Sequence, residues 1–537
     1  MSKKLSYVDK GFLLAESREM PMHVGGVSLY SLPDGADEHE FIHSLAANVR
    51  NTDALLPPFG ERLKTGRLGL AGNVFWEDDP SMDMDYHVRH SALPKPGRYR
   101  ELFNLVSRLH GTLLERSRPL WEMHLIEGLP DRQFAVYTKS HHAAVDGARS
   151  VHISRSMLSA DPNSILDESP LSLKSWQRYK NSIRAGESDA PTEAELRNAA
   201  DMIKSTFDSG ANIFRAMSGF AKGWAGRGGD LVLPHRKVPR SSLNGNIDGA
   251  RRFVAQSWPF ARIHKMGKAY GGTFNDAVLA MCGGALRRYL IEHAELPEES
   301  LKSMIPVSLR QKGDVDSGNA VATISADLGT NISDPVERIT TIIASVQAGK
   351  AFYEGMSPKE IELVSMIMQS PAALLMPLGL LPKLPPYNVA ISNVPGIREP
   401  MYWNGAKLNG NYPVSIITDG MALNITLVTY DQNVDFGIIA CRRSVPQVQR
   451  LIDYMEEALT ELELAAGIRY QADAAPKTTA STPKRKAPAA KKPAAKKAAA
   501  KKPAARKKAP AKKKAVAKTK VAANAPEEQQ TSAALGD

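Results

Sequence analysis

Two adjacent histidines stand in the stretch Ser140-His141-His142-Ala143-Ala144-Val145-Asp146-Gly147, just ahead of an Asp-Gly pair. Residues 134–139, Phe-Ala-Val-Tyr-Thr-Lys, are rich in β-forming side chains and predict a strand that leads into the histidines. Apolar residues after the stretch recur at roughly helical spacing. We therefore expect a strand that ends at the histidines, and a turn at Asp146-Gly147 that leads into a helix. Side chains on such a turn can project together into a cleft.

This pattern suits proton transfer. A neutral imidazole has an unperturbed pKa of about 6.5, so near pH 7 it can take a proton from a hydroxyl as that hydroxyl attacks a carbonyl. Neighbouring strand residues point to opposite sides, so only one of the two histidines should face a substrate. The structural alternative is that one ring packs in the core and the other is solvated. The Asp-Gly pair at fixed spacing favours the chemical interpretation.

Further motifs narrow the interpretation to a family. The stretch 141–147 matches the HHxxxDG motif of the CoA-dependent acyltransferase superfamily, which includes chloramphenicol acetyltransferase-like enzymes and peptide-synthetase condensation domains. The chain also resembles bacterial wax ester synthase/diacylglycerol acyltransferases, from about Ser6 to about Leu464. The flanking motifs that carry this resemblance are Pro21-Met22-His23-Val24-Gly25, Pro119-Leu120-Trp121-Glu122, Asn275-Asp276 and Asn393-Val394-Pro395-Gly396.

The resemblance implies an α/β fold of two chloramphenicol acetyltransferase-like domains, with the active site at their interface. It implies acyl transfer from acyl-CoA to a long-chain alcohol, giving a wax ester, or to diacylglycerol, giving triacylglycerol. His142 is the expected general base, and His141 is expected to pack or to orient it. Asp146 is expected to hold the loop by pairing with an arginine, for which Arg310 is a candidate. Gly147 permits the turn.

Two further residues are candidates for substrate contact. Thr273 is expected to be the N-cap of a helix, and Asn275 lies in the first turn of that helix. Asn275 is therefore either a substrate ligand or simply a polar residue at a helix start. Met421 precedes an alternating strand pattern and is expected to approach the apolar cleft, where a flexible Met fills gaps. The sequence shows no metal-ligand spacing, and we expect no cofactor beyond acyl-CoA as a substrate. The two cysteines, Cys282 and Cys441, suggest a reducing compartment.

Length and composition predict several parts. We expect an N-terminal domain at 1–183, a helical connector at 184–245, a C-terminal domain at 246–470 and a disordered Lys/Ala/Pro-rich tail at 471–537. The Gly-rich run 223–229 follows no predicted strand and lacks the glycine spacing of a dinucleotide-binding loop, so we expect an ordinary loop there. The uncharged run 363–382 is interrupted by three prolines, so we expect a buried or interface-lying helical pair rather than a spanning helix.

Charge is unevenly distributed along the chain. Residues 477–520 hold 18 Lys or Arg and no acid, so subtracting 18 from the net charge of +12 leaves −6 for the rest. The tail could contact anionic lipid or DNA. No long apolar run follows the first residues, so we expect no secretory signal. We expect a cytoplasmic enzyme on the inner face of the membrane or on lipid inclusions.

Two other functions remain open. A condensation-domain-like enzyme would use a carrier-bound acyl donor, although no carrier domain is visible in the sequence. A nucleic-acid-binding protein is suggested by the tail alone.

Overall fold

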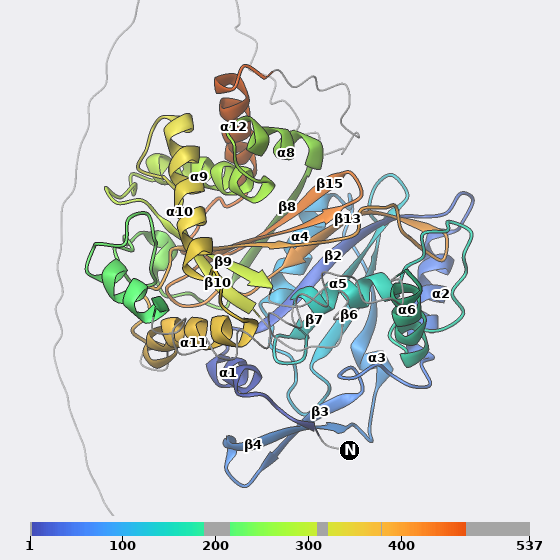
Figure 1. Cartoon of the computed structure of the whole chain (residues 1–537). Helices are drawn as coiled ribbons and strands as arrows, with labels where there is room; N and C mark the ends of the chain where they lie inside the picture. The colour runs from blue at the N-terminus through green and yellow to red at the C-terminus, as the bar shows by residue number, and fades with distance from the viewer. Residues whose placement is uncertain (1–2, 146, 187–214, 309–320, 377–378, 469–537) are drawn as a thin grey trace, which may run out of the picture. The chain divides into compact units, whose positions relative to one another are not determined.

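The computed structural model describes residues 3–145, 147–186, 215–308, 321–376 and 379–468 (Figure 1). Asp146, Arg310 and the predicted tail therefore lie outside the described residues, as does the part of the predicted connector at 187–214. By contacts, residues 1–478 form one compact unit, separate from 479–537.

The first large sheet contains β7, the strand that ends in the histidines. Its order is β12-β13-β2-β7-β6-β5, and only the β5–β6 pair is parallel. Its strands are β12 (Tyr402–Trp403), β13 (Ala406–Val414), β2 (His23–Ser31), β7 (Gln133–His141), β6 (Trp121–Glu127) and β5 (Val88–Ala92). The predicted strand 134–139 is confirmed within β7. The helices that precede the second sheet in the sequence are α1 (Tyr7–Ala15), α2 (Glu38–Arg50), α3 (Met84–His87), α4 (Tyr99–His110), α5 (Gly147–Ser156) and α6 (Leu173–Gly186).

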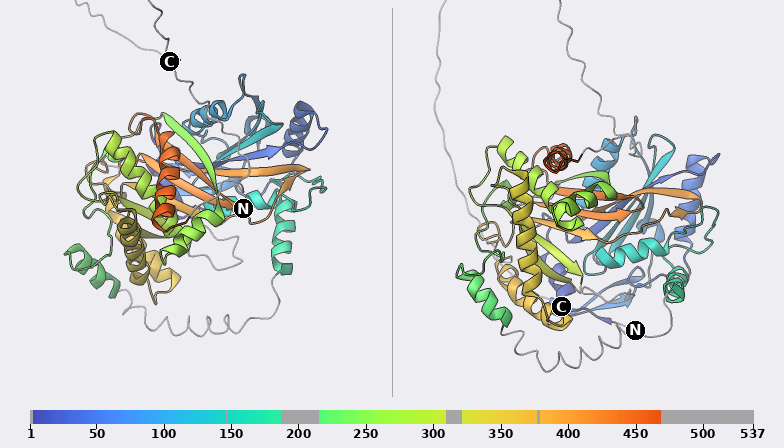
Figure 2. Two further views of the ribbon diagram at one scale, coloured as in Figure 1. Left: turned by 90° about the horizontal axis from the view of Figure 1, so that it is seen from above. Right: turned by 45° about the horizontal axis from the view of Figure 1, so that its top comes forward.

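The second large sheet has the order β10-β9-β11-β14-β15-β8. Its strands are β10 (Val321–Asp327), β9 (Lys302–Ser308), β11 (Val389–Val394), β14 (Leu423–Tyr430), β15 (Asn433–Cys441) and β8 (Arg251–Pro259). Four helices contact it or one another in Figures 1 and 2: α8 (Phe260–Ala269), α9 (Phe274–Glu292), α10 (Pro335–Phe352) and α12 (Arg450–Ala465). A short 3-10 helix, η1 (Ser242–Asn244), precedes β8. A small third sheet has the order β1-β4-β3, and its strands are β1 (Lys3–Lys4), β4 (Gly69–Asp78) and β3 (Glu61–Gly66).

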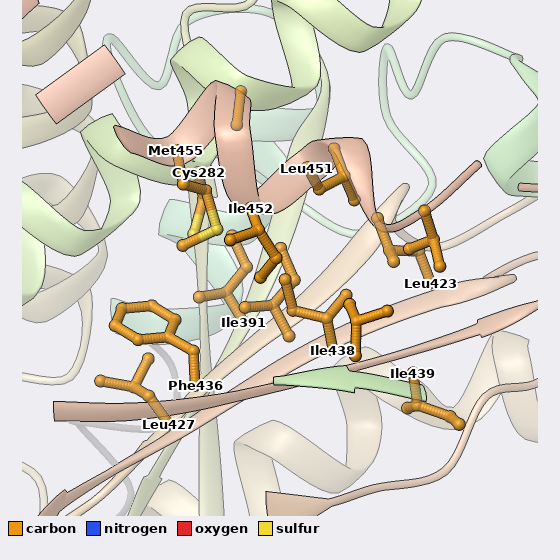
Figure 3. Packing of buried hydrophobic residues seen from close by; sticks show 14 of the residues in the cluster. Cys282, Ile391, Leu423, Leu427, Phe436, Ile438, Ile439, Leu451, Ile452 and Met455 are labelled. Atoms are coloured by element: carbon orange, nitrogen blue, oxygen red, sulfur yellow. The ribbon is translucent and has the colours of Figure 1, made fainter. Parts of the chain in front are cut away.

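The main core lies beneath these helices. All eight residues of β14 are buried, and so are eight of the nine in β15, so both faces of these central strands are covered. Figure 3 shows side chains of α9 and α12, including Cys282 and Met455, packed over Ile391, Leu427 and Phe436 of the sheet. Burial raises the pKa of the Cys282 thiol to about 12, so this cysteine is an inert core residue.

One strand connects distant parts of the sequence. Strand β13 pairs with β2 in the first sheet, from Lys407 opposite Ser31 to Val414 opposite Gly25. It also contacts β14 and β15 of the second sheet. The contact is close, because a Cβ built on Gly437 of β15 would stand 1.7 Å from the Pro413 carbonyl oxygen. The two large sheets therefore meet along β13, and the mixed α/β class is confirmed.

The described residues of the apolar run 363–382 form one helix rather than the expected pair. Helix α11 (Pro358–Leu375) begins with a capping box at Ser357 and Glu360 and continues through Pro371. Turns follow at 379–383. None of the described helices combines the length and apolar character needed to cross a membrane.

Candidate active site

The backbone on both sides holds the two histidines in place. His141 is the last residue of β7 and lies opposite His23 of β2. Its amide donates to the Leu120 carbonyl at 2.9 Å, and the His142 amide donates to the Met22 carbonyl at 2.9 Å. Helix α5 begins at Gly147. The predicted strand and helix are thus confirmed on either side of residue 146.

His141 faces the protein interior, and its side chain is 1% exposed. Its Nδ1 accepts a hydrogen bond from the Ala143 amide at 3.1 Å, and its Nε2 lies 3.4 Å from Glu16 Oε1. Glu16 also binds Arg116 at 2.8 Å. Burial raises the pKa of the Glu16 carboxyl, but His141, Arg116 and the Met22 amide together lower it below its usual value. Glu16 is therefore a charged, buried group that orients the His141 ring.

His142 has different surroundings. It is only partly buried, and its ring stacks on Phe12 of α1 with centroids 4.1 Å apart and an interplanar angle of 17°. Phe12 of α1 therefore contacts His142, and Glu16, the residue after α1, contacts His141. No local sequence pattern indicates either residue, because only the fold brings positions 12–16 to the end of β7.

A cavity of about 130 Å³ adjoins this stretch. Ser140 and Val145, which flank the histidines in sequence, contribute to its wall. The wall combines the first sheet, helix α5 and the second sheet, with Val136, Thr138, Gly25, Val151, Met157, Val394 and Val428 among its lining residues. The cavity is therefore largely apolar and lies where the two sheets meet.

A buried ionic network underlies β7. Lys139 is fully buried and lies 3.3 Å from Glu122, the residue after Trp121 in β6. Glu122 also contacts His124 at 3.2 Å and Arg89 at 3.3 Å. Burial raises the pKa of Glu122, but the His124 hydrogen bond and the charges of Lys139 and Arg89 outweigh it and lower the pKa to about 2. A lysine inside a predicted strand is the one sequence signal that could have indicated this network.

The two residues of the Asn-Asp motif have different contacts. Asp276 completes a capping box with Thr273 at the start of α9, so its place in the structure is that of a helix cap. Asn275 is exposed, and its Oδ1 accepts a hydrogen bond from Nδ2 of Asn393 at 2.7 Å. The structure thus joins the Asn-Asp motif to the Asn-Val-Pro-Gly motif at the end of β11.

The cavity wall, as the described residues form it, does not include His141, His142, Asn275 or Met421. Met421 is partly buried in a turn in which its amide donates to the Thr418 carbonyl at 2.9 Å, and it does not line the cavity. Asp146 and its candidate partner Arg310 lie outside the described residues. Trp121, expected to be structural, is buried and donates from its indole nitrogen to the Phe59 carbonyl at 2.7 Å.

The arrangement has counterparts among known folds. The starter condensation domain of rhizomide synthetase superposes with a TM-score of 0.51 at 11% identity, over 87% of this chain and 94% of that one. This likeness concerns the fold alone.

Sequence comparison is more specific. The model of the wax ester synthase/diacylglycerol acyltransferase catalytic domain matches residues 5–278, and that of the C-terminal domain of the same family matches residues 317–463. The chain belongs to the wax ester synthase/diacylglycerol acyltransferase family, and it is an acyltransferase.

Three similar proteins illustrate the match. A Mycobacterium tuberculosis protein described as a probable diacylglycerol O-acyltransferase is 43% identical over 86% of this chain and 98% of its own length. The O-acyltransferase WSD of Acinetobacter baylyi is 38% identical over 87% of this chain and 97% of its own length. The wax ester synthase/diacylglycerol acyltransferase structure from Marinobacter aquaeolei has a TM-score of 0.68 at 38% identity, over 87% of this chain and all of that one.

Proposed function

We propose that this acyltransferase moves a fatty acyl group from acyl-CoA to a long-chain alcohol, to diacylglycerol, or to both, as a step of storage-lipid synthesis. The names of its relatives support these substrates. The observation that carries the site assignment is the difference between the two histidines. His141 is buried against Glu16, whereas His142 is partly exposed and stacks on Phe12. Neither histidine lines the apolar cavity itself, but Ser140 and Val145, on either side of them in the sequence, do.

The proposed reaction is a direct transfer. The imidazole of His142 takes the proton of the acceptor hydroxyl while its oxygen forms a bond to the thioester carbonyl carbon. The carbon–sulfur bond then breaks, and the protonated imidazole returns the proton to the CoA thiolate. The products are an ester and free CoA, and we propose that no further cofactor or metal takes part. Glu16 supports this role by holding His141, and through it the end of β7.

The other predicted residues keep their proposed roles. Asp146 would hold the loop, Gly147 would permit the turn, and Asn275 would contact a substrate carbonyl or hydroxyl together with Asn393. Met421 is proposed to influence alcohol length. We further propose that the chain forms two chloramphenicol acetyltransferase-like domains with the site at their interface, followed by a disordered basic tail. The meeting of the two sheets beside the cavity supports an interfacial site.

A coupled assay tests the proposal. The full chain is mixed with a long-chain acyl-CoA and either a fatty alcohol or a diacylglycerol; free CoA is followed with a thiol reagent, and the esters are separated by thin-layer chromatography. CoA release that depends on the acceptor and matches the ester formed is expected. Acyl transfer that requires an acyl carrier protein in place of acyl-CoA would favour the condensation-type alternative.

We propose that the enzyme works in the cytoplasm at a membrane or lipid-inclusion surface. Helix α11 supports this, because Leu363, Met366 and Ile367 are 43%, 54% and 39% exposed at the spacing of a single helical face. The helix carries no charge after Glu362. Such a face can lie in the boundary between headgroups and acyl chains.

A further inference from the structure

A cluster of metal-type ligands lies at the edge of the first sheet. His39 belongs to the first turn of α2, His90 to the edge strand β5, and Glu127 is the last residue of β6. One nitrogen of each histidine and one oxygen of the glutamate all lie within 4.8 Å of one another. Among the described residues, no other group of three His, Cys, Asp or Glu meets this criterion.

The distances suit a tetrahedral cation. His39 Nδ1 lies 3.1 Å and His90 Nε2 lies 3.2 Å from the same oxygen, Oε2 of Glu127. Zinc binds nitrogen and oxygen ligands at about 2.0–2.2 Å, so neighbouring ligand atoms of a tetrahedral site are about 3.3 Å apart. The two pairs that include Glu127 already have this spacing, and the two histidine nitrogens lie within 4.8 Å of each other, so a small movement of the histidines would let all three ligands reach one ion.

The hydrogen bonding of His90 adds a second indication. Its Nε2 is buried and makes no hydrogen bond of acceptable geometry, although the Glu127 oxygen is close enough to accept one. A buried nitrogen without a proper partner costs free energy, which a bound cation would recover. Here that nitrogen points into the group formed by His39 and Glu127.

The surroundings also favour a cation. His43 stands one turn further along α2, with its ring centroid 6.3 Å from that of His39, and it is exposed. Acidic residues 37, 38 and 40 flank His39 in the sequence. Glu38 ties the two elements together by accepting a hydrogen bond from the Gly128 amide at 2.8 Å. These carboxylates offset the positive end of the helix dipole at the start of α2.

We propose that His39, His90 and Glu127 form a binding site for a divalent transition-metal cation of the zinc type. Two imidazoles and one carboxylate match zinc, nickel or cobalt better than magnesium or calcium, which prefer oxygen ligands. A bound ion would link the start of α2 to β5 and β6. The histidines of the candidate active site lie at the end of β7, a different strand, so the metal site is separate from the proposed chemistry.

The test is zinc titration by calorimetry on tag-free, full-length protein, with MgCl₂ as the control cation. His39→Ala is the main variant, because a side chain 70% exposed can be removed without affecting folding. Glu127→Gln keeps the shape of the third ligand, and His264→Ala controls for losing a partly exposed histidine elsewhere.

We expect both cluster variants to lose one zinc equivalent, or to bind it at least ~10-fold more weakly, since even outer-sphere changes cost about 10–100-fold. Zinc should raise the melting temperature of the wild type and of His264→Ala, but not of the cluster variants. Absence of zinc binding by the wild type, or equal affinity and stoichiometry in His39→Ala, overturns the proposal.

Discussion

At the scale of single residues, the two neighbouring histidines differ because of what α1 brings to them. Phe12 stacks on His142, and the Glu16 carboxylate lies beside His141. The motif predicts that one histidine faces a substrate, and strand alternation predicts that the other turns inward. The identity of the inward partner depends on a contact across 125 residues of sequence, so no local pattern reveals it.

Replacing His142 with alanine should lower kcat by ~10²–10⁴-fold, the usual contribution of general-base catalysis. His141→Ala should lose less activity but more stability, because it leaves the buried Glu16 carboxylate without one of its partners. Steady-state kinetics and thermal melting separate the two effects, with His264→Ala as the control. A folded His142→Ala enzyme with near-wild-type turnover would exclude the proposed base.

Glu122→Gln should destabilise the protein by ~3–5 kcal/mol near neutral pH, because it leaves the buried Lys139 without its counter-charge. The folded-state pKa of Glu122 is about 2, below the usual 4.5, so its stabilisation is complete above pH 4.5. That stabilisation is lost as the pH falls from about 4.5 towards 2, and the gap between wild type and variant should narrow over this range.

Urea unfolding at several pH values measures this gap. The matched control is Glu399→Gln. Glu399 pairs with Arg155 at the surface, and both side chains are about half exposed. An exposed pair contributes ~0–1 kcal/mol, so this variant should remain close to wild type. A Glu122 effect as small as the control, or one that does not change with pH, would contradict a buried ionic role.

At the scale of elements, the close pairing of β2 with β7 depends on Gly25. A Cβ at this position would stand 2.2 Å from the Thr138 carbonyl oxygen, whereas a Cβ on Gly26 would meet its nearest atom, Asn411 Oδ1, at 3.5 Å. Gly25→Ala should therefore destabilise the fold by ~1–3 kcal/mol through overpacking, and Gly26→Ala by clearly less. Thermal melting of the two single variants tests this, and equal melting temperatures would count against the steric argument.

Helix α11 supports a second prediction at this scale. Met366→Asp with Ile367→Asp should reduce co-sedimentation with lipid vesicles severalfold, because charges on the apolar face oppose insertion. Ile291→Asp is the matched control, since Ile291 is 48% exposed on α9, a different helix. If the control and the α11 variant lose binding equally, the face of α11 is not the docking surface.

The sequence predicts elements better than it predicts their neighbours. Periodicity and turn residues correctly indicate β7, the start of α5 and the cap of α9, because these depend on residues close in the chain. The pairing of β13 with β2 joins residues more than 370 positions apart and leaves no local pattern. The expectation that Met421 approaches the cleft rests only on the strand pattern that follows it, whereas the cavity wall is assembled from both sheets.

At the scale of the whole molecule, charge and chemistry occupy different parts of the chain. The motif residues all precede residue 465, while the 18 basic residues of 477–520 belong largely to the second contact unit. The remainder carries a net charge of −6, and three of its acids lie after residue 520, so residues 1–476 carry a net charge of −3 and the body has no general attraction for anionic surfaces. Any salt-sensitive binding to a polyanion should therefore depend on the tail.

Ending the chain after Ala475 should leave activity on dispersed substrates unchanged, because residues 1–478 form a compact unit without the tail. The truncated enzyme should bind anionic vesicles or DNA more weakly, since each well-placed Lys or Arg contributes ~1 kcal/mol at an anionic lipid surface and DNA affinity falls steeply with salt. A full-length variant with the 18 basic residues changed to glutamine separates charge from length. Vesicle and DNA binding at two salt concentrations, beside the coupled assay, distinguishes the outcomes. A truncated enzyme that is inactive on dispersed substrates would show that the tail belongs to the catalytic unit.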